Sequence, residues 1–346
     1  MLMIFADMAL TVPEPDPRPV GPTGRVGSVD RVACPVTAGV GGGEELRQCF
    51  EDDHFGTQAA PDAAKLQADH AGSDHAQLLR HRFDVECAGV VEAIGSDVTR
   101  WKVGDEVIHS AGSGGFCAQV VAHELAVLPK PAALSFEAAA GVSITYLTSY
   151  HALVQRAQIQ PGETLLVLGA AGGVGSTAVE LGKALGATVI AAASSDDKLA
   201  LCQQLGADHI INYSTESLKD RVKELTGGKG VDVVYDPVGG DFSEPAVRSM
   251  GWNGRYLVIG FASGPIPSIP LNLTLLKGCA IVGVFWGRFT MEEPEMHQAN
   301  IKTLWQWFEE GKIKPVITDL FPIEEYEAAY AAMMERRAKG KVILTL

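Results

Sequence analysis

Short apolar runs separated by amphipathic segments fill the chain between residues 164 and 285. The first run is Thr164–Leu168, and ATVIAAA, HIIN, VDVVYD, GRYLVIG and CAIVGVF follow it. Runs of this length are typical of strands that are buried on both faces of a sheet. Helical segments such as TESLKDRVKELTG separate most of them. The alternation predicts a doubly wound α/β domain, with six strands in a parallel sheet and a ligand at their carboxyl ends.

The first run ends in a glycine-rich turn, GAAGGVG, and a helical pattern follows it up to Gly186. Because Gly172 and Gly173 have no Cβ, the backbone can approach a pyrophosphate closely, and Gly175 allows the helix to pack on the strand. The free N–H groups at the start of the helix then face the phosphates. This strand, turn and helix predict a Rossmann-type dinucleotide site formed by Gly172, Gly173, Val174 and Gly175.

The residues after the second run bear on which dinucleotide is bound. An NAD site needs an acidic side chain there, because its carboxylate bonds the ribose 2′-OH. This chain has Ser194 and Ser195, followed by Asp196, Asp197 and Lys198. Hydroxyl groups and a lysine suit a 2′-phosphate. The two aspartates fit the first turn of a helix, where carboxylates favour the positive end of the dipole. We therefore predict NADPH as the cofactor, with Ser195 and Lys198 at its 2′-phosphate.

Two further helices are predicted near the C-terminus. TMEEPEMHQANIKTLWQWFEEGKIKP has the period of an amphipathic helix that Gly311 ends. Its inward side chains are expected to be Ile301, Leu304, Trp305 and Phe308. IEEYEAAYAAMMERRAKGK predicts a second helix, which basic residues and Gly340 end.

With these features the chain resembles the medium-chain dehydrogenase/reductase superfamily, most of all its zinc-independent NADPH:quinone oxidoreductase branch. The matching motifs run in family order from about Asp84 to the C-terminus, and include ECAGVVEAIGSDVTRWKVGDEV, LSFEAAAGVSITYLTSYHAL, TGGKGVDVVYDPVGGDFSE and RRAKGKVIL. The resemblance implies a co-chaperonin-like, partly β-barrel catalytic domain formed by residues 83–147 and 286–346. The dinucleotide domain, residues 148–285, would be inserted between them. It also implies a homodimer whose nucleotide sheets join through CAIVGVF.

The resemblance also implies roles for single residues around the cofactor. Three groups are expected: Thr148 and His151 near the nicotinamide; Lys198, Tyr213 and Arg337 around the 2′-phosphate; and Gly260, Phe261, Phe285 and Trp286 beside the nicotinamide ribose and the substrate pocket. Lys341 is expected near the pyrophosphate. Each has a structural alternative, such as a core aromatic for Tyr213 or a buried, hydrogen-bonded histidine for His151. No catalytic residue is identified.

The motifs predict no metal. Zinc-dependent relatives carry a histidine before the glutamate of the E-x-A-G-V-V strand, where this chain has Val85. A catalytic zinc needs three protein ligands, and the spacing of His70, His75 and His81 fits neither helical ligation nor a zinc finger. Without zinc, the expected reaction is hydride transfer from NADPH to a quinone. An α,β-unsaturated carbonyl, such as a 2-alkenal, an enone or an enoyl thioester, is the alternative acceptor.

Residues 1–82 do not match the resemblance. All seven tyrosines and all five tryptophans lie after residue 100, and strand-like alternation is weak before Phe83. The segment is divergent but folded, or disordered, or the product of a shifted reading frame, and its abrupt join and composition favour the last. Missing strands would damage the substrate pocket more than the nucleotide domain. A second hypothesis is therefore an NADPH-binding protein with little or no catalytic activity.

Composition mainly excludes other classes of protein. The net charge of −14 argues against a nucleic-acid partner, because phosphate binding needs an excess of basic residues. No apolar run is long enough to span a membrane. The six cysteines form no CxxC pair, which is typical of a reduced, cytoplasmic chain. We therefore expect a cytoplasmic enzyme with a small-molecule substrate.

Overall fold

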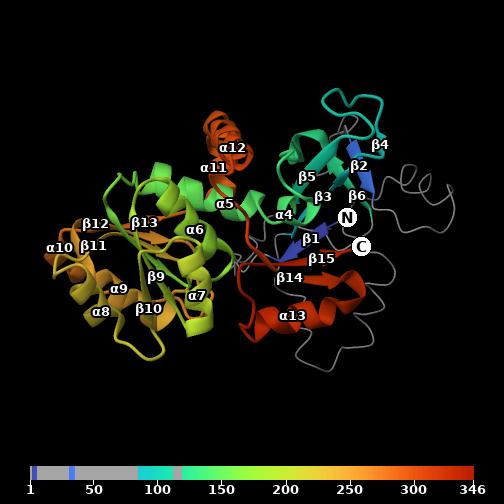
Figure 1. The fold of residues 1–346 in the computed structure, drawn as a ribbon. Helices are drawn as coiled ribbons and strands as arrows, with labels where there is room; N and C mark the ends of the chain where they lie inside the picture. Colours follow the sequence, from blue (N-terminus) through green and yellow to red (C-terminus); the bar gives the residue numbers. More distant parts are fainter. Residues whose placement is uncertain (1, 6–30, 36–84, 112–118) are drawn as a thin grey trace, which may run out of the picture. The chain divides into compact units, whose positions relative to one another are not determined.

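The computed structural model describes residues 2–5, 31–35, 85–111 and 119–346, and its central feature is a parallel six-stranded sheet (Figure 1). The strand order is β10-β9-β8-β11-β12-β13, and every neighbouring pair is parallel. The predicted doubly wound sheet is confirmed, because each apolar run forms one strand. The strands are β8 (Thr164–Leu168), β9 (Thr188–Ala193), β10 (His209–Asn212), β11 (Val231–Asp236), β12 (Met250–Val258) and β13 (Ala280–Gly283).

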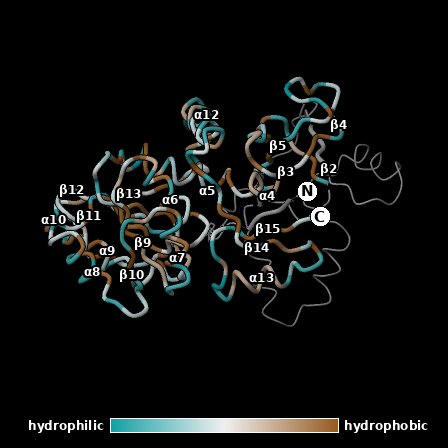
Figure 2. The backbone as a smooth tube through the Cα atoms, in the orientation of Figure 1, coloured by the Kyte–Doolittle hydropathy of each residue, from teal (hydrophilic) through white to brown (hydrophobic). Residues whose placement is uncertain are grey.

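Alternate side chains of these strands enter two separate cores, and the apolar strands are brown in Figure 2. Leu165 and Val167 of β8 pack on one face with helices α5, α6, α7 and α12. Leu166 and Leu168 pack on the other face with α8, α9 and α10. Both faces are covered, which explains the continuous apolar runs. The helices are α5 (Ser143–Tyr150), α6 (Gly173–Ala184), α7 (Asp196–Gln204), α8 (Leu218–Leu225), α9 (Ser243–Arg248), α10 (Asn272–Lys277) and α12 (Pro294–Glu309).

Two further sheets bring together segments that are far apart in the sequence. One has the order β14-β15-β1-β3-β5-β7, and the other has the order β4-β2-β6. The C-terminal strands β14 and β15 thus share a sheet with β3, β5 and β7, as expected if the last stretch completes the N-terminal domain. The strands are β1 (Leu2–Phe5), β2 (Arg31–Pro35), β3 (Val85–Val90), β4 (Ala93–Ile94), β5 (Glu106–Ala111), β6 (Gln119–His123), β7 (Val127–Pro129), β14 (Ile317–Pro322) and β15 (Lys341–Thr345).

Strands β1 and β2 lie in the first 82 residues, where the sequence has little strand pattern. β1 pairs antiparallel with β15 and β3, and β2 pairs antiparallel with β4 and β6. The rest of that segment, with His70, His75 and His81, lies outside the described residues, so the three interpretations of the segment stay open.

The C-terminal helices agree with the sequence except at one end. α12 buries Ile301, Leu304 and Phe308 as expected. α13 (Tyr326–Met334) ends earlier than predicted, because Arg336 already takes the left-handed conformation just after it, with φ 56°. Gly340 takes that conformation too, with φ 61°, just before β15. Shorter elements are α4 (Phe136–Ala139), α11 (Trp286–Glu292), a π-helix (His151–Arg156) and single 3₁₀ turns at η1 (Glu124–Ala126), η3 (Gly240–Phe242) and η4 (Ile323–Glu325).

One predicted domain boundary falls inside a helix, and the other falls at the start of a helix. The boundary between residues 147 and 148 lies inside α5, and that between 285 and 286 lies where α11 begins. The division stays a prediction. Within the described ranges, no helix combines the length and the apolar character that crossing a bilayer requires. The cytoplasmic location also stays a prediction.

Candidate functional site

The carboxyl ends of β8, β11 and β12 adjoin one another where the strand order reverses. A Cβ on Gly169, which follows β8, would lie 2.8 Å from Cγ2 of Val238, which follows β11. A Cβ on Gly239 would lie 2.8 Å from Cδ1 of Phe261, which follows β12. Open α/β sheets bind ligands at such a reversal. The structure thus brings the predicted residues Gly260 and Phe261 to the edge that carries the glycine-rich turn.

The buried carboxylate of Asp236 fixes the loop after β11. Its Oδ1 accepts hydrogen bonds from the N–H groups of Val238, at 2.7 Å, and Gly239, at 2.9 Å. Its Oδ2 accepts hydrogen bonds from the hydroxyl groups of Ser243 and Tyr256. Sequence reasoning did not single out Asp236, although it stands in the DPVGG motif. Four donors on one buried carboxylate hold this part of the crevice in a single conformation.

The glycine-rich turn has the predicted geometry. Gly172 is the N-cap of α6, and Gly173, Val174 and Gly175 form its first turn. A Cβ on Gly175 would lie 2.1 Å from the carbonyl oxygen of Gly169, so the helix can approach the strand only with glycine at this position. No side chain of the described residues caps α6. The first N–H groups of a helix without such a cap can bind an anion.

Lys341 lies against this turn, and its expected contact with a pyrophosphate stays a prediction. A Cβ on Gly173 would lie 3.6 Å from its Cδ and 3.7 Å from its Cε. The preceding residue, Gly340, donates its N–H to the carbonyl oxygen of Ala171 at 2.7 Å. The Lys341 side chain is 4% exposed, and its Nζ lies 3.6 Å from Oε2 of Glu86. The hydrogen bond of Gly340 therefore attaches the start of β15 to the turn. The ammonium group of Lys341 is near the start of α6.

The first turn of α7, which follows β9, contains one lysine and two aspartates. The two aspartate carboxylates have partners in other segments of the chain. The Ser195 hydroxyl caps α7 by accepting from the N–H of Lys198. Nζ of Lys198 donates to the carbonyl oxygen of Arg336 at 2.7 Å. Asp196 accepts from the side-chain amide of Asn212 at 2.7 Å, and Asp197 forms an ion pair with Lys339 at 2.6 Å. One oxygen of each aspartate is therefore bonded to a partner in another segment of the chain.

Arg336 joins Lys198 and Tyr213, whereas the predicted Arg337 has a different partner. Burial raises the pKa of the Tyr213 hydroxyl, while Ser194 and the positive charge of Arg336 oppose the shift. The guanidinium of Arg337 is exposed and donates to Glu335 at 2.6 Å. The two arginines are adjacent in RRAKGK, so the motif identifies the pair but not which of them faces Tyr213.

The residues expected at the nicotinamide end fall into two environments. Thr148 is 2% exposed, and its hydroxyl has no hydrogen-bond partner among the described residues. His151 and Phe285 line one pocket of about 590 Å³, together with Gln155 and Phe289. The ring of Phe285 is exposed, so it is not a core aromatic. A buried hydroxyl without a partner is rare in proteins and is suited to a ligand.

His151 belongs to a hydrogen-bond network with Gln155 and Asn300, whose assigned amide orientations place the ring hydrogen on Nδ1. Gln155 Nε2 donates to Asn300 Oδ1 at 2.9 Å, and Asn300 Nδ2 donates to Gln155 Oε1 at 3.2 Å. Since Gln155 Oε1 is an acceptor, Nδ1 of His151, 3.2 Å away, is the donor to it. Burial lowers the pKa of His151, which favours the neutral ring. Nε2 of that ring can accept a hydrogen bond but cannot donate one.

Aromatic rings surround this histidine. The ring of His151 stacks on Phe289 with a centroid distance of 3.9 Å. The ring of His297 lies edge-on to Phe289 and to Trp286, with centroid distances of 6.2 and 5.7 Å. Nε1 of Trp286 is buried and has no hydrogen-bond partner in the described part of the chain. Trp286 is thus linked to His151 through two other rings, and its expected contact with a nicotinamide ribose stays a prediction.

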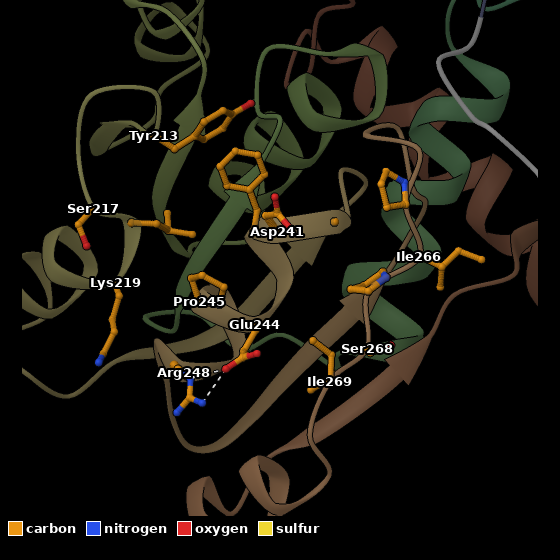
Figure 3. A pocket seen from close by; sticks show the side chains of 15 residues that line it. Tyr213, Ser217, Lys219, Asp241, Glu244, Pro245, Arg248, Ile266, Ser268 and Ile269 are labelled. Atoms are coloured by element: carbon orange, nitrogen blue, oxygen red, sulfur yellow. Dashed lines mark hydrogen bonds and ion pairs between the residues drawn. The ribbon is translucent and has the colours of Figure 1, made fainter.

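A second hollow, of about 720 Å³, lies between α8, α9 and the loop around Ile266 (Figure 3). It contains only one predicted site residue, Tyr213, whose ring lies 4.4 Å from that of Phe242. Arg248 and Glu244 on its wall form an ion pair with each other at 2.6 Å. This hollow adjoins the end of β10 and has no contact with the glycine-rich turn. We therefore place the candidate site along β8, β9 and β11 to β13, outside this hollow.

In the described ranges, no three histidine, cysteine, aspartate or glutamate side chains gather in a way that could hold a metal ion. Glu86, which follows Val85 in the strand that carries the zinc-site motif in other relatives, is paired with Lys341. The expectation that the protein needs no metal stays a prediction.

Two family models match the chain. The model described as alcohol dehydrogenase GroES-like domain matches residues 66–157, and the model described as zinc-binding dehydrogenase matches residues 173–308. The first begins inside the segment that the motifs leave unmatched. Together they support the co-chaperonin-like and dinucleotide-binding parts of the predicted fold.

Individual proteins are also similar to the chain. Quinone oxidoreductase-like protein 2 of Bos taurus is 40% identical over 263 residues, which are 76% of this chain and 75% of that protein. The crystal structure of the quinone oxidoreductase of Pseudomonas syringae pv. Tomato DC3000 is 34% identical with a TM-score of 0.69, covering 75% of this chain and 81% of its own. The structure of CurK enoyl reductase is 25% identical with a TM-score of 0.69, covering 99% and 98%.

Proposed function

The chain belongs to the medium-chain dehydrogenase/reductase superfamily, in its quinone oxidoreductase branch, and from this premise we propose that it is an NADPH-dependent reductase which transfers hydride to a quinone without a metal ion. The oxidoreductase class follows from the family. The cofactor, the acceptor, the absence of a metal and the dimer are our proposals.

The arrangement after β9 carries the proposal for NADPH. Asp196 and Asp197 are held by Asn212 and Lys339, and the side chain of Lys198 lies beside Arg336. An NAD site would need a carboxylate directed at the ribose, whereas a 2′-phosphate needs cations and hydroxyl groups. The hydroxyl group of Tyr213 lies within the electrostatic influence of Arg336. Lys198, Arg336 and the Tyr213 hydroxyl are thus the cations and the hydroxyl group that would bind a 2′-phosphate here.

The residues of the crevice fit a dinucleotide at three further points. The N–H groups at the start of α6 and the ammonium group of Lys341 would hold the pyrophosphate. The unpartnered hydroxyl of Thr148 would donate to or accept from the nicotinamide half. The loop that Asp236 fixes would border the ribose through Gly260 and Phe261. When bound, NADPH supplies the hydride, and these residues would orient it and exclude water.

The state of His151 supports a quinone as the acceptor. A quinone that accepts hydride becomes a stabilised phenolate, which water can protonate. An enone benefits more from a protein donor near the developing enolate. The neutral His151 ring has its hydrogen on Nδ1, where Gln155 accepts it, so Nε2 has no proton to donate. The exposed ring of Phe285 offers a flat apolar surface in the same pocket.

An enone or enoyl thioester reductase is the second candidate, and the likeness to CurK enoyl reductase over nearly the whole chain favours it. A third candidate is a protein that binds NADPH without turnover. It remains because most residues that precede β3 lie outside the described ranges.

A homodimer is also part of the proposal. β13 is the last strand in the sheet order, so within the described residues its outer edge has no partner strand. The helix that leads into it, α10, exposes Leu275 and Leu276, and Leu271 just before it is also exposed. Exposed apolar side chains beside an open sheet edge support association with a second copy through β13.

The deciding experiment measures oxidation of NADPH by the purified protein with 1,4-benzoquinone, with an α,β-unsaturated aldehyde in parallel. Each acceptor is also tested with NADH, and NADPH binding is titrated on the same sample. Turnover that is faster with NADPH and with the quinone supports the proposal. Faster turnover of the aldehyde favours the second candidate, and binding without turnover favours the third. Equal rates with NADH would contradict the assignment of the cations after β9.

A further inference from the structure

Glu86 is a fully buried carboxylate whose two oxygens have different partners. Its Oε1 accepts hydrogen bonds from the hydroxyl of Ser143 and from the N–H of Ile144, at the start of α5. Its Oε2 accepts no hydrogen bond from the described residues and lies 3.6 Å from Nζ of Lys341. One oxygen therefore anchors the carboxylate to a helix, and the other faces an ammonium group.

Lys341 crosses from this carboxylate to the glycine-rich turn. Its Cγ packs on Gly141, where an added Cβ would be 3.4 Å away, and its Cδ and Cε pack on Gly173. Small residues on both sides leave a narrow passage for the lysine chain. Since Lys341 and Glu86 are 4% and 0% exposed, water does not screen the charges of the pair.

We propose that Glu86 is a positioning residue for cofactor binding, which keeps Lys341 charged and directed along the glycine-rich turn so that a pyrophosphate meets a preformed cation. The inference rests on the proposed function, because it needs a dinucleotide at that turn. A buried lysine without a counter-charge tends to lose its proton. Glu86 supplies a counter-charge in the free protein, before any phosphate is bound.

In the parts of β5, α5, α6 and β14 that pack near the pair, the side chains are mostly ones that do not titrate. In the register of β3 and β5, Ser110 stands opposite Glu86, whereas His109 stands opposite Cys87 and so lies on the other face of the sheet. The residues of α5, α6 and β14 nearest to the pair are Ser143, Gly173 and Ile317, and none of them titrates. Burial raises the pKa of the Glu86 carboxyl, and Lys341, Ser143 and Ile144 oppose the shift. Among the described residues, Lys341 is thus the charge that acts on Glu86.

The test uses Glu86→Gln, which keeps the shape and an oxygen for Ser143 but removes the charge. NADPH binding is titrated by calorimetry between about pH 7.5 and pH 9.5, a range in which a lysine without its counter-charge loses its proton. We expect the wild type to bind with nearly constant affinity. The variant should bind more weakly as pH rises, by about tenfold for each pH unit once Lys341 is neutral in the free protein, because binding must then take up a proton. Lys341→Met should bind weakly at every pH, and adding Glu86→Gln to it should change nothing further.

Glu163→Gln is the matched control, because Glu163 also forms a half-buried ion pair, with Arg255. Glu163 immediately precedes β8, whereas the glycine-rich turn follows the carboxyl end of that strand. It should lower thermal stability but leave the pH profile of NADPH binding flat. If Glu86→Gln does not fold, Ser143→Ala removes one anchor of the carboxylate and should produce a smaller slope of the same sign. A flat profile at wild-type affinity in the folded Glu86→Gln or Ser143→Ala protein overturns the inference. A wild type that binds no NADPH overturns the proposed function instead.

Discussion

The carbonyl oxygen of Gly169 occupies the space that a Cβ on Gly175 would need, since the two atoms would be only 2.1 Å apart. This contact joins the end of β8 to the first turn of α6. Gly175 is therefore required by the fold itself, because it allows two backbone segments to approach each other. This requirement holds with or without a bound cofactor.

Substituting Gly175→Ala should therefore damage both the fold and the crevice. The obstacle is a backbone atom, so the helix must move away from the strand, at an expected cost of about 3 kcal/mol in the free energy of unfolding. NADPH affinity should fall with it, because the N–H groups of α6 move. Gly172→Ala is the matched control, since its Cβ would lie 3.3 Å from the same oxygen. Chemical denaturation of both variants checks the order, and equal stabilities would contradict the explanation.

Arg336 should contribute more to NADPH binding than Arg337. The charge of Arg336 acts on Tyr213 and its carbonyl oxygen holds Lys198, whereas Arg337 is exposed and paired with Glu335. Arg336→Ala should weaken NADPH binding by about tenfold, the usual effect of losing one charge-assisted bond to a phosphate. NADH binding should change little, because NADH has no 2′-phosphate. Arg337→Ala serves as the control, and a larger loss in that variant would restore the assignment expected from the motif.

The sequence predicted the parts of the fold that depend on local pattern. The six strands from β8 to β13 are apolar because helices cover both faces of the sheet, so each strand is visible in its own residues. The glycine-rich turn is equally local. The choice between the two arginines is not, since it depends on where α13 ends and on the left-handed conformation of Arg336.

The pairing of Glu86 with Lys341 could not be predicted in the same way. One residue is in β3 and the other begins β15, and they meet only because β1 lies between these strands in one sheet and Gly340 is bonded to Ala171. Strand β1 itself has four residues and lies in a segment without clear alternation. Contacts that depend on the order of strands in a sheet leave no mark at a fixed spacing along the chain.

Introducing a charge beside β13 should separate the proposed dimer. Leu275→Glu places a carboxylate on the exposed side of α10, next to the open edge of the parallel sheet, and burying it in an interface without a partner is unfavourable. We expect the mass measured by light scattering to fall from that of two chains to that of one. Leu125→Glu, at a leucine in η1 that is also exposed, is the control and should leave the mass unchanged. A wild type with the mass of one chain would contradict the dimer itself.

Acid should destabilise the protein before its carboxylates titrate, because three histidines are held neutral. Burial lowers the pKa of His109, His151 and His297 from an ordinary value of 6.5. A group whose pKa is lower in the folded state contributes stability above its unfolded pKa and loses it as pH falls, since the unfolded chain then binds more protons. The thermal midpoint should therefore decrease as pH is lowered from about 7.5 to about 5.5, across the ordinary histidine range.

His109→Asn should reduce this decrease, and it isolates one of the three groups. Nδ1 of His109 lies 3.1 Å from the carbonyl oxygen of Ala126, and an asparagine amide can donate to the same oxygen without titrating. At about pH 7.5 both side chains are neutral, so the variant should be near the wild type in stability. The remaining difference is the small space that the asparagine leaves where the larger histidine ring was. Differential scanning calorimetry at several pH values measures both slopes. If the slope of the variant equals that of the wild type, the buried ring of His109 is not a source of the acid sensitivity.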